Sequence, residues 1–300
     1  MYRNLTSRQI GFIQIILSGM CFGALGFFGK MAYKVSVAPG ELLALRYSIS
    51  AILMGIAIIL TNPKSFILTR FQLISSLLLG ICGYALFSSF FFIALTGLSA
   101  SLTVLLLYTY PVMVAVLSQF ILKEHLGKKG VMALAIASIG MIGLVWGELS
   151  ISDPKFLLFG VGAAFFYSLY IMYSRKYLSD VPAMPSSFYV QLGAGAILSL
   201  IYFKNFERPL SIVTNHPAII FGMAIICSFM AMTLFLAGLR RITSSEASIL
   251  STTEPMFGVL IAAMVLEEKL SMIQICGGVL ILIAMVILAL SKEKQKQRTY

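Results

Sequence analysis

The sequence predicts an all-α membrane protein of ten transmembrane helices, built as two inverted five-helix repeats. Three observations lead to this prediction. The chain is 59% apolar and only 11% charged over 300 residues, whereas soluble domains are about a quarter charged. Its apolar runs are long enough to cross a bilayer. The chain also resembles itself when it is shifted by 144 residues.

Ten apolar runs each come close to the roughly 20 residues that a membrane helix needs. Polar breaks, or breaks rich in Pro and Gly, leave predicted spans at 9–32, 40–61, 71–95, 99–122, 128–147, 155–176, 185–203, 217–239, 244–266 and 272–291. The shortest breaks lie at 96–99 and 240–243, where hydropathy alone would also permit one fused helix. The count of ten therefore depends on two further patterns.

The first pattern is the distribution of lysine and arginine. With ten spans and a cytoplasmic N-terminus, fifteen of these residues lie inside and six outside, and Arg46 lies within the second span. Because cytoplasmic loops are enriched in these residues, we expect a protein of the cytoplasmic membrane with both termini in the cytoplasm. The net charge of +11 is then a topology signal. We expect no nucleic-acid partner, since the basic residues do not share one face.

The second pattern is the internal repeat. The shift pairs Pro111 with Pro255 in mid-helix and Glu124 with Glu268 at a helix end. An odd number of spans per copy places the two copies in opposite orientations, which is a recurrent arrangement in secondary transporters. The predicted units are a first repeat, a second repeat and a cytoplasmic basic tail, at 1–147, 148–291 and 292–300.

Two blocks of sequence resemble a known family. The segment 108–111 (YTYP) precedes a helix that ends in 122–126 (LKEHL), and the segment 253–255 (TEP) precedes one that ends in 266–270 (LEEKL). Both blocks resemble the EamA domain, and the duplicated chain is similar to the drug/metabolite transporter superfamily. The resemblance implies a ten-helix fold with a central cavity lined mainly by helices 1, 3, 4, 6, 8 and 9.

The predicted function is that of a secondary transporter, not an enzyme. It would move a small polar metabolite, such as an amino acid or a related amine or nucleotide-like compound, by alternating access, as an exporter or exchanger. An uptake carrier of the S-adenosylmethionine type is the alternative. A membrane enzyme or a channel is less favoured, because HExxH, GxSxG and P-loop motifs and a filter-like loop are absent. We expect no cofactor and no metal site.

Glu254 is the strongest candidate for substrate binding. It lies near the middle of the ninth span beside Pro255. A carboxylate at this depth is costly unless it faces a cavity, has a partner or is protonated, and the proline frees a backbone carbonyl. The pair would suit a cationic or amino group, or a proton as coupling ion, although facilitated diffusion is equally compatible. A protonated Glu254 bonded to a neighbouring helix is the plainer alternative.

The other candidates would extend this site. Tyr110 is the repeat mate of Glu254, and Tyr108 is the mate of Thr252, so an aromatic wall would face a polar one. The further predicted substrate contacts are Tyr84, Tyr167, Tyr170 and Arg46, with hinges at Pro111 and Pro255. Packing or interfacial anchoring is the alternative for the tyrosines, and snorkelling to the interface is the alternative for Arg46.

Two sets of residues suggest helix contacts. Glu124 and Glu268 would make matched loop contacts, as gates or as ordinary solvated charges. The motifs Gly19-x-x-x-Gly23 and Gly143-x-x-x-Gly147 allow helices to approach closely, either within one chain or in a dimer. We therefore expect a monomer or homodimer whose partners are the lipid bilayer and a small-molecule substrate.

Overall fold

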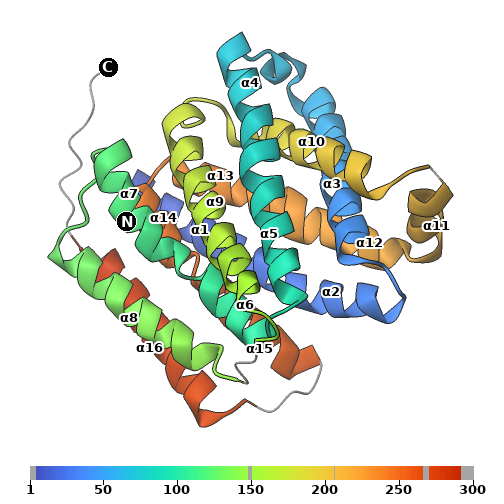
Figure 1. Cartoon of the computed structure of the whole chain (residues 1–300). Helices are drawn as coiled ribbons and strands as arrows, with labels where there is room; N and C mark the ends of the chain where they lie inside the picture. The colour runs from blue at the N-terminus through green and yellow to red at the C-terminus, as the bar shows by residue number, and fades with distance from the viewer. Residues whose placement is uncertain (1–4, 148–150, 206, 266–269, 292–300) are drawn as a thin grey trace.

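The computed structural model describes residues 5–147, 151–205, 207–265 and 270–291, and these form a bundle of helices (Figure 1). The first half contains α1 (Ser7–Gly23), α2 (Leu25–Lys34), α3 (Pro39–Thr61), η1 (Pro63–Phe66), α4 (Arg70–Leu78), η2 (Leu79–Ala85), α5 (Leu86–Leu95), α6 (Ala100–Leu107), α7 (Tyr110–Ile121) and α8 (Lys128–Leu144). The second half contains α9 (Lys155–Tyr177), α10 (Ala183–Tyr202), α11 (Glu207–Asn215), α12 (Pro217–Ala224), η3 (Ile225–Met230), α13 (Ala231–Leu239), α14 (Ser244–Leu250), α15 (Thr253–Val265) and α16 (Met272–Ala289). The predicted all-α class is confirmed for this part of the chain, while the basic tail at 292–300 lies outside it.

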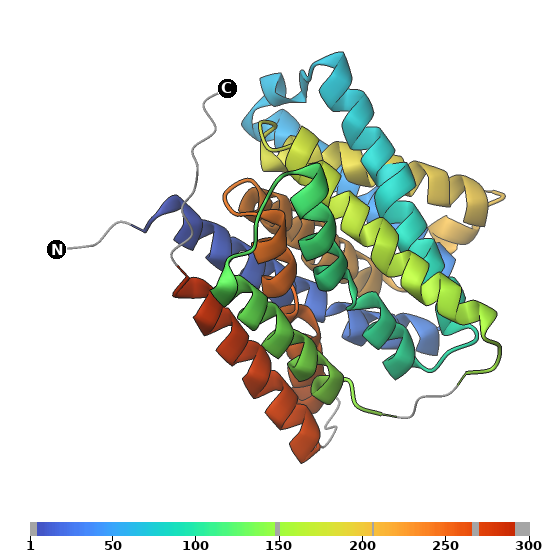
Figure 2. The same cartoon turned by 60° about the vertical axis from the view of Figure 1, so that its left-hand side comes forward.

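Nine helical segments within the described ranges are long and apolar enough to cross a membrane. The predicted fifth span forms the shorter helix α8, which ends at Leu144 instead of residue 147 and has 17 residues. At 1.5 Å per residue it is about 26 Å long, slightly less than the ~30 Å hydrocarbon core. It packs along α16 at one edge of the bundle (Figure 2).

Several helices begin where the sequence supplies a capping residue. Thr6, Thr69, Thr243 and Ser271 each accept a hydrogen bond from the backbone N–H three residues later, and the Gln or Glu at that position bonds back. Such capping boxes satisfy backbone donors that a helix start would otherwise leave free. The tight turn at 240–243 is one of these starts, so α13 and α14 are separate helices and not one.

The helix interruptions recur in both halves, within two residues of the 144-residue shift. A break between α6 and α7 at 108–109 corresponds to the break between α14 and α15 at 251–252. The π-helical turns η2 and η3 likewise fall at corresponding positions. A proline follows the break in each half: Pro111 is the second residue of α7 and Pro255 is the third residue of α15. At the start of a helix the missing N–H of a proline costs little.

Helices that correspond in the two halves pack against each other in antiparallel pairs. Near one end of the α3–α10 pair Gly40 meets Tyr202, and near the other Gly55 meets Phe188. In the second pair, Gly140 of α8 contacts Gly277 of α16, and these glycines bring the two backbones together. Close approach through small residues is the usual basis of helix packing in membranes.

The outer surface of the bundle is apolar and its interior contains small polar groups. Leu60, Phe120 and Leu200 are each more than three-quarters exposed, as lipid-facing residues would be. Inside, Ser18 of α1 donates to the carbonyl of Ala231 at 2.7 Å, and Ser48 lies 3.1 Å from Ser199, Oγ to Oγ. Such bonds hold membrane helices together by satisfying polar groups internally.

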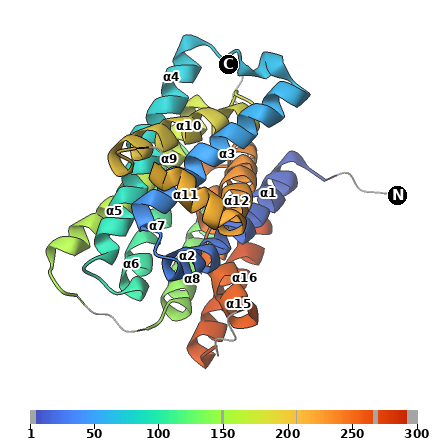
Figure 3. The same cartoon turned by 90° about the vertical axis from the view of Figure 1, so that its right-hand side faces the viewer.

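The sequence did not predict the short helix α11, which lies between α10 and α12. Arg208 of this helix donates to both carboxylate oxygens of Glu41, at 2.8 and 3.1 Å, and to the carbonyl of Ser36 at 3.2 Å. These bonds attach α11 to the start of α3. In Figure 3, α2 lies at one end of the bundle and the start of α4 at the other.

Candidate functional site

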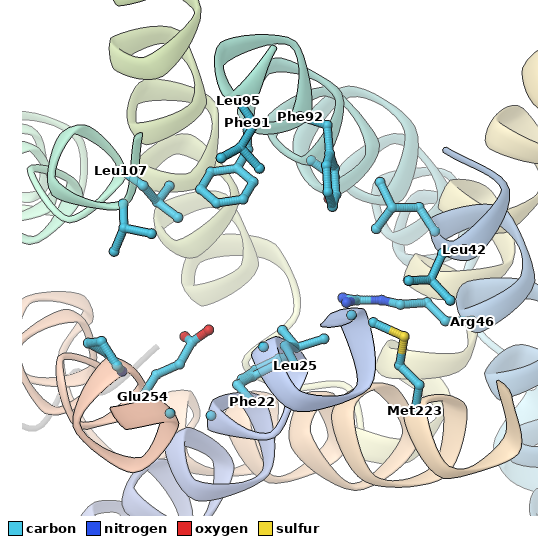
Figure 4. A pocket seen from close by; sticks show the side chains of 18 of the residues that line it. Phe22, Leu25, Leu42, Arg46, Phe91, Phe92, Leu95, Leu107, Met223 and Glu254 are labelled. Atoms are coloured by element: carbon cyan, nitrogen blue, oxygen red, sulfur yellow. The ribbon is translucent and has the colours of Figure 1, made fainter. Parts of the chain in front are cut away.

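A cavity of about 440 Å³ opens in the middle of the bundle. It runs from Glu254 toward the end of the bundle where α2 finishes, and Tyr33 at that end is 45% exposed. Figure 4 shows side chains from several helices that surround an open centre. The lining comes from α1, α2, α3, η2, α5, α6, α7, α9, α12 and α15, together with the break at Tyr108.

Glu254 lies in the first turn of α15, directly after the helix break, and its carboxylate points into the cavity (Figure 4). Its backbone N–H donates to the carbonyl of Ser251 at 3.0 Å. Two glycines of α1 set its position: a Cβ on Gly19 would come 3.3 Å from the Glu254 nitrogen, and one on Gly23 would come 2.9 Å from its carbonyl oxygen. The predicted small-residue motif thus packs α1 against α15.

Tyrosines of the first half and of α9 form one wall near Glu254. The Tyr110 and Tyr167 rings lie 4.7 Å apart between centroids, and Tyr108 lies 5.7 Å from Tyr110. Tyr84 belongs to the same cluster through Phe87, which is 5.2 Å from Tyr84 and 4.6 Å from Tyr167. These four tyrosines line the same cavity as Glu254.

Arg46 lines the cavity from α3, although only 5% of its surface is exposed. Its Nη2 donates to the Tyr47 hydroxyl at 2.9 Å, and its guanidinium lies 4.4 Å from the centroid of that ring. The Tyr47 hydroxyl in turn lies 3.0 Å from Ser88 Oγ. This chain of contacts holds Arg46 inside the bundle, so the guanidinium does not snorkel to the interface.

Three of the predicted residues do not line the cavity. Tyr170 lies behind the wall, 6.1 Å from Tyr167 in a stacked arrangement, and its hydroxyl donates to Met232 Sδ at 3.1 Å. Thr252 is buried and donates to the carbonyl of Ile249 at 2.7 Å. Pro111 is buried in the first turn of α7, whereas Pro255 does line the cavity.

Several lining residues were not singled out from the sequence. The second span was not among the helices expected to line the cavity, yet besides the predicted Arg46 it contributes Leu42, Leu43 and Tyr47. Further walls come from Phe22, Phe87, Phe91 and Phe92. No local signal marks these phenylalanines, because aromatic residues in apolar runs also serve ordinary packing.

The opposite end of the bundle is closed by α14, whose residues are all buried. Ser118 of α7 and Ser245 of α14 lie 3.0 Å apart, Oγ to Oγ. Arg8 donates to Glu246 through Nη2 at 2.6 Å and Nε at 2.8 Å, and also to the carbonyls of Leu288 and Ser291. The capping-box pattern at 243–246 was the signal that could have identified Glu246.

Glu124 also belongs to this closed end. Its carboxylate accepts a hydrogen bond from the Ser244 N–H at 2.9 Å and lies 3.7 Å from Arg175 Nε. Burial raises the pKa of Glu124, against the opposing effects of Ser244 and Arg175. Its predicted mate Glu268 lies outside the described residues. Among those that are described, no group of three or more His, Cys, Asp and Glu side chains could hold a metal ion.

The model of the EamA-like transporter family matches residues 9–146 and 154–290. The chain belongs to this family. The resemblance noted in the two Pro-to-Glu blocks is therefore confirmed, and the protein is an integral membrane protein of a transporter family. The two matched segments are separated by residues 147–153.

Curated relatives extend over nearly the whole of this EamA-family chain. It is 25% identical over 284 residues to "Uncharacterized transporter YyaM" of Bacillus subtilis (strain 168), with 90% of this chain and 91% of that protein covered. It is 22% identical over 288 residues to "Uncharacterized transporter YcbK" of the same organism, with 91% of each covered. A solved crystal structure with 19% identity superposes with a TM-score of 0.75 over 94% of this chain and 95% of the other, which shows a shared fold.

Proposed function

We propose that the protein is a secondary transporter that moves a small polar metabolite across the cytoplasmic membrane by alternating access. The metabolite would be an amino acid or a related amine or nucleotide-like compound, and the protein would act as an exporter or exchanger. Glu254, Arg46, Tyr84, Tyr108, Tyr110 and Tyr167 would contact the substrate. Tyr170 and Thr252 would support this wall from behind.

One observation carries the proposal. The cavity reaches one end of the bundle and ends at Glu254, where the buried helix α14 closes the other end. A site that is open to one side and closed to the other is the arrangement that alternating access requires. The breaks before Pro111 and Pro255 would be the hinges, because helix interruptions change angle more easily than continuous helices.

Ten membrane helices in two inverted repeats are part of the proposal, with α8 as the fifth span. The antiparallel packing of α3 on α10 and of α8 on α16 supports opposite orientations of the two halves. With the N-terminus in the cytoplasm, as the lysine and arginine bias favours, the open end of the cavity faces outward. The charged contacts of Arg8, Glu124 and Arg175 then close the cytoplasmic side.

Counterflow in proteoliposomes would test the proposal. Metabolites that differ between overexpressing and deleted cells would first be identified without preselection. Each would then be loaded at high concentration inside vesicles that contain purified protein, and uptake of the labelled compound from outside would be measured. Transient accumulation above equilibrium is expected of a carrier with alternating access. Simple equilibration at a rate that does not saturate would instead indicate a channel and overturn the proposal.

A further inference from the structure

The cavity contains two opposite charges on facing walls. The Glu254 carboxylate enters from α15, and the Arg46 guanidinium enters from α3 on the other side (Figure 4). Each half of the chain supplies one of them, since the repeat mates of Arg46 and Glu254 are the uncharged Val190 and Tyr110. The cavity is therefore polarised, with a negative pole and a positive pole.

The Arg46 guanidinium keeps donors that the protein does not use. Among the described residues, its one hydrogen bond is to the Tyr47 hydroxyl, and its Nε is buried without a partner. It forms no ion pair with a described carboxylate: Glu41 on the same helix is bonded to Arg208. A buried charge without a counter-ion is costly, and a guanidinium matches the geometry of a carboxylate with two parallel hydrogen bonds.

The Glu254 carboxylate likewise has no ion pair with a described cation. Tyr108 and Arg46 line the same cavity, and Arg46 lies across its open centre from Glu254 (Figure 4). A carboxylate that faces a cavity beside an aromatic wall is suited to an ammonium group, which donates to the oxygens and is attracted to ring faces. The third charged lining residue, Lys30, is exposed toward the open end.

Aromatic side chains occupy much of the wall between the two poles. Phe22, Phe91 and Phe92 lie around the open centre in Figure 4, and the four tyrosines of the cluster line the same cavity. A volume of about 440 Å³ is within the ~300–1,000 Å³ range of small-molecule sites. Such walls favour a ligand whose middle or side group is apolar or aromatic.

We propose that the substrate is a zwitterionic amino compound with a bulky apolar or aromatic group. Its ammonium group binds Glu254, its carboxylate binds Arg46, and its apolar group packs on the phenylalanines. This assignment rests on the proposed transport function, because it names the substrate class of the same site. A purely cationic substrate would leave Arg46 unpaired, and a purely anionic substrate would leave Glu254 unpaired.

Three probes of one shape separate these classes. L-phenylalanine has both charges, 2-phenylethylamine has only the ammonium group, and 3-phenylpropionate has only the carboxylate. Binding to the purified full chain would be measured by isothermal titration calorimetry, which does not depend on transport. The variants are Arg46→Gln and Glu254→Gln, with Ser50→Ala as the control. Ser50 is also buried in α3, but it does not line the cavity.

The expected result is a crossed pattern. Wild-type protein binds L-phenylalanine about tenfold or more tightly than either single-charge probe. Arg46→Gln weakens the binding of L-phenylalanine and 3-phenylpropionate by about tenfold or more and leaves the binding of 2-phenylethylamine unchanged. Glu254→Gln weakens the binding of L-phenylalanine and 2-phenylethylamine by a similar factor and leaves the binding of 3-phenylpropionate unchanged. If Arg46→Gln does not fold, Arg46→Lys takes its place, because it keeps the charge but loses the planar fork of the guanidinium. It should weaken the binding of L-phenylalanine and 3-phenylpropionate but not that of 2-phenylethylamine.

Other outcomes would overturn the assignment. Equal binding of all three probes, equal weakening of all three by one variant, or no binding of any probe at millimolar concentration each contradicts a zwitterion site. Counterflow of the same probes separates this failure from failure of the transport proposal. A crossed binding pattern without counterflow would contradict transport and leave the site assignment intact. Counterflow of a metabolite without the crossed binding pattern would support transport and contradict the zwitterion site.

Discussion

The Glu124 carboxylate accepts a hydrogen bond from the Ser244 N–H at 2.9 Å, so the loop after α7 is bonded to the first residue of α14. This bond joins the two halves of the chain at the closed end of the cavity. Arg175 of α9 lies 3.7 Å from the same carboxylate. Three segments that are far apart in the sequence are therefore held by one side chain.

The first prediction concerns the pH dependence of this contact. Burial raises the pKa of Glu124 above its ordinary 4.5, so the folded state binds this proton more readily than the unfolded state. The contribution of Glu124 to the free energy of unfolding should therefore increase as the pH falls through the raised pKa, and be complete below 4.5. Glu124→Gln removes this contribution. Thermal unfolding of detergent-solubilised protein between pH 7 and pH 4 would measure it.

Wild type should accordingly gain stability relative to Glu124→Gln as the pH falls. Lys64→Gln, an exposed change outside the helices that close this end, is a control that should leave the slope of stability against pH unchanged. A wild type that loses stability relative to Glu124→Gln over this range would contradict the prediction, because it would mean that folding favours the ionised carboxylate.

The second prediction concerns Glu254. Glu254→Gln keeps the size of the side chain but removes the charge at the end of the cavity. A hydrogen bond to a charged group contributes about 1.5–3 kcal/mol, so transport at low substrate concentration should fall by about tenfold or more. Initial counterflow rates in proteoliposomes would measure the loss. The matched control is Glu207→Gln in the exposed helix α11, and equal rates for both variants would contradict a role for Glu254.

The third prediction concerns the contact of α1 with α15. A Cβ on Gly23 would lie 2.8 Å from Phe257 Cβ and 2.9 Å from the Glu254 carbonyl oxygen. Gly23→Ala should therefore separate these helices, lower the free energy of unfolding by about 1–3 kcal/mol and reduce transport. Gly26→Ala is the control, since no heavy atom lies within 4 Å of its added Cβ. Thermal unfolding of the two variants would be compared, and counterflow of Gly23→Ala would be measured against wild type.

Gly26→Ala should be neutral or slightly stabilising, because alanine favours a helix over glycine. A Gly23→Ala protein as stable as Gly26→Ala would show that α1 and α15 can shift apart without cost, and the close packing would then not position Glu254.

The fourth prediction concerns orientation. In a variant whose four cysteines are replaced by alanine, Lys64→Cys and Lys204→Cys each place one thiol at an exposed position between membrane helices. A membrane-impermeant maleimide should label the cysteine at position 204 in intact cells, and the one at position 64 only after the membrane is permeabilised. The two changes each remove one lysine, so they are matched in charge. The reverse labelling would mean that the cavity opens toward the cytoplasm.

Much of the helix layout follows from local sequence. Hydropathy and the 144-residue shift predicted the positions of the spans, and the interruptions near Pro111 and Pro255 lie where proline chemistry places them. The end of α8 at Leu144 and the helix α11 were not predicted. Short polar helices such as α11 have no long apolar run, so hydropathy does not detect them.

Some residues of the candidate site could likewise be identified from the sequence, and others could not. Glu254 could be identified from the sequence because a carboxylate within an apolar run is costly wherever it lies, and that cost depends only on local composition. The placement of Arg46 opposite Glu254 could not be identified from the sequence, nor could the burial of Tyr170 and Thr252 away from the cavity. Which face of a helix meets a cavity depends on how that helix is rotated against neighbours far away in the sequence. Only the tertiary packing, through contacts such as Gly23 on α15 and Tyr47 on Ser88, decides that rotation.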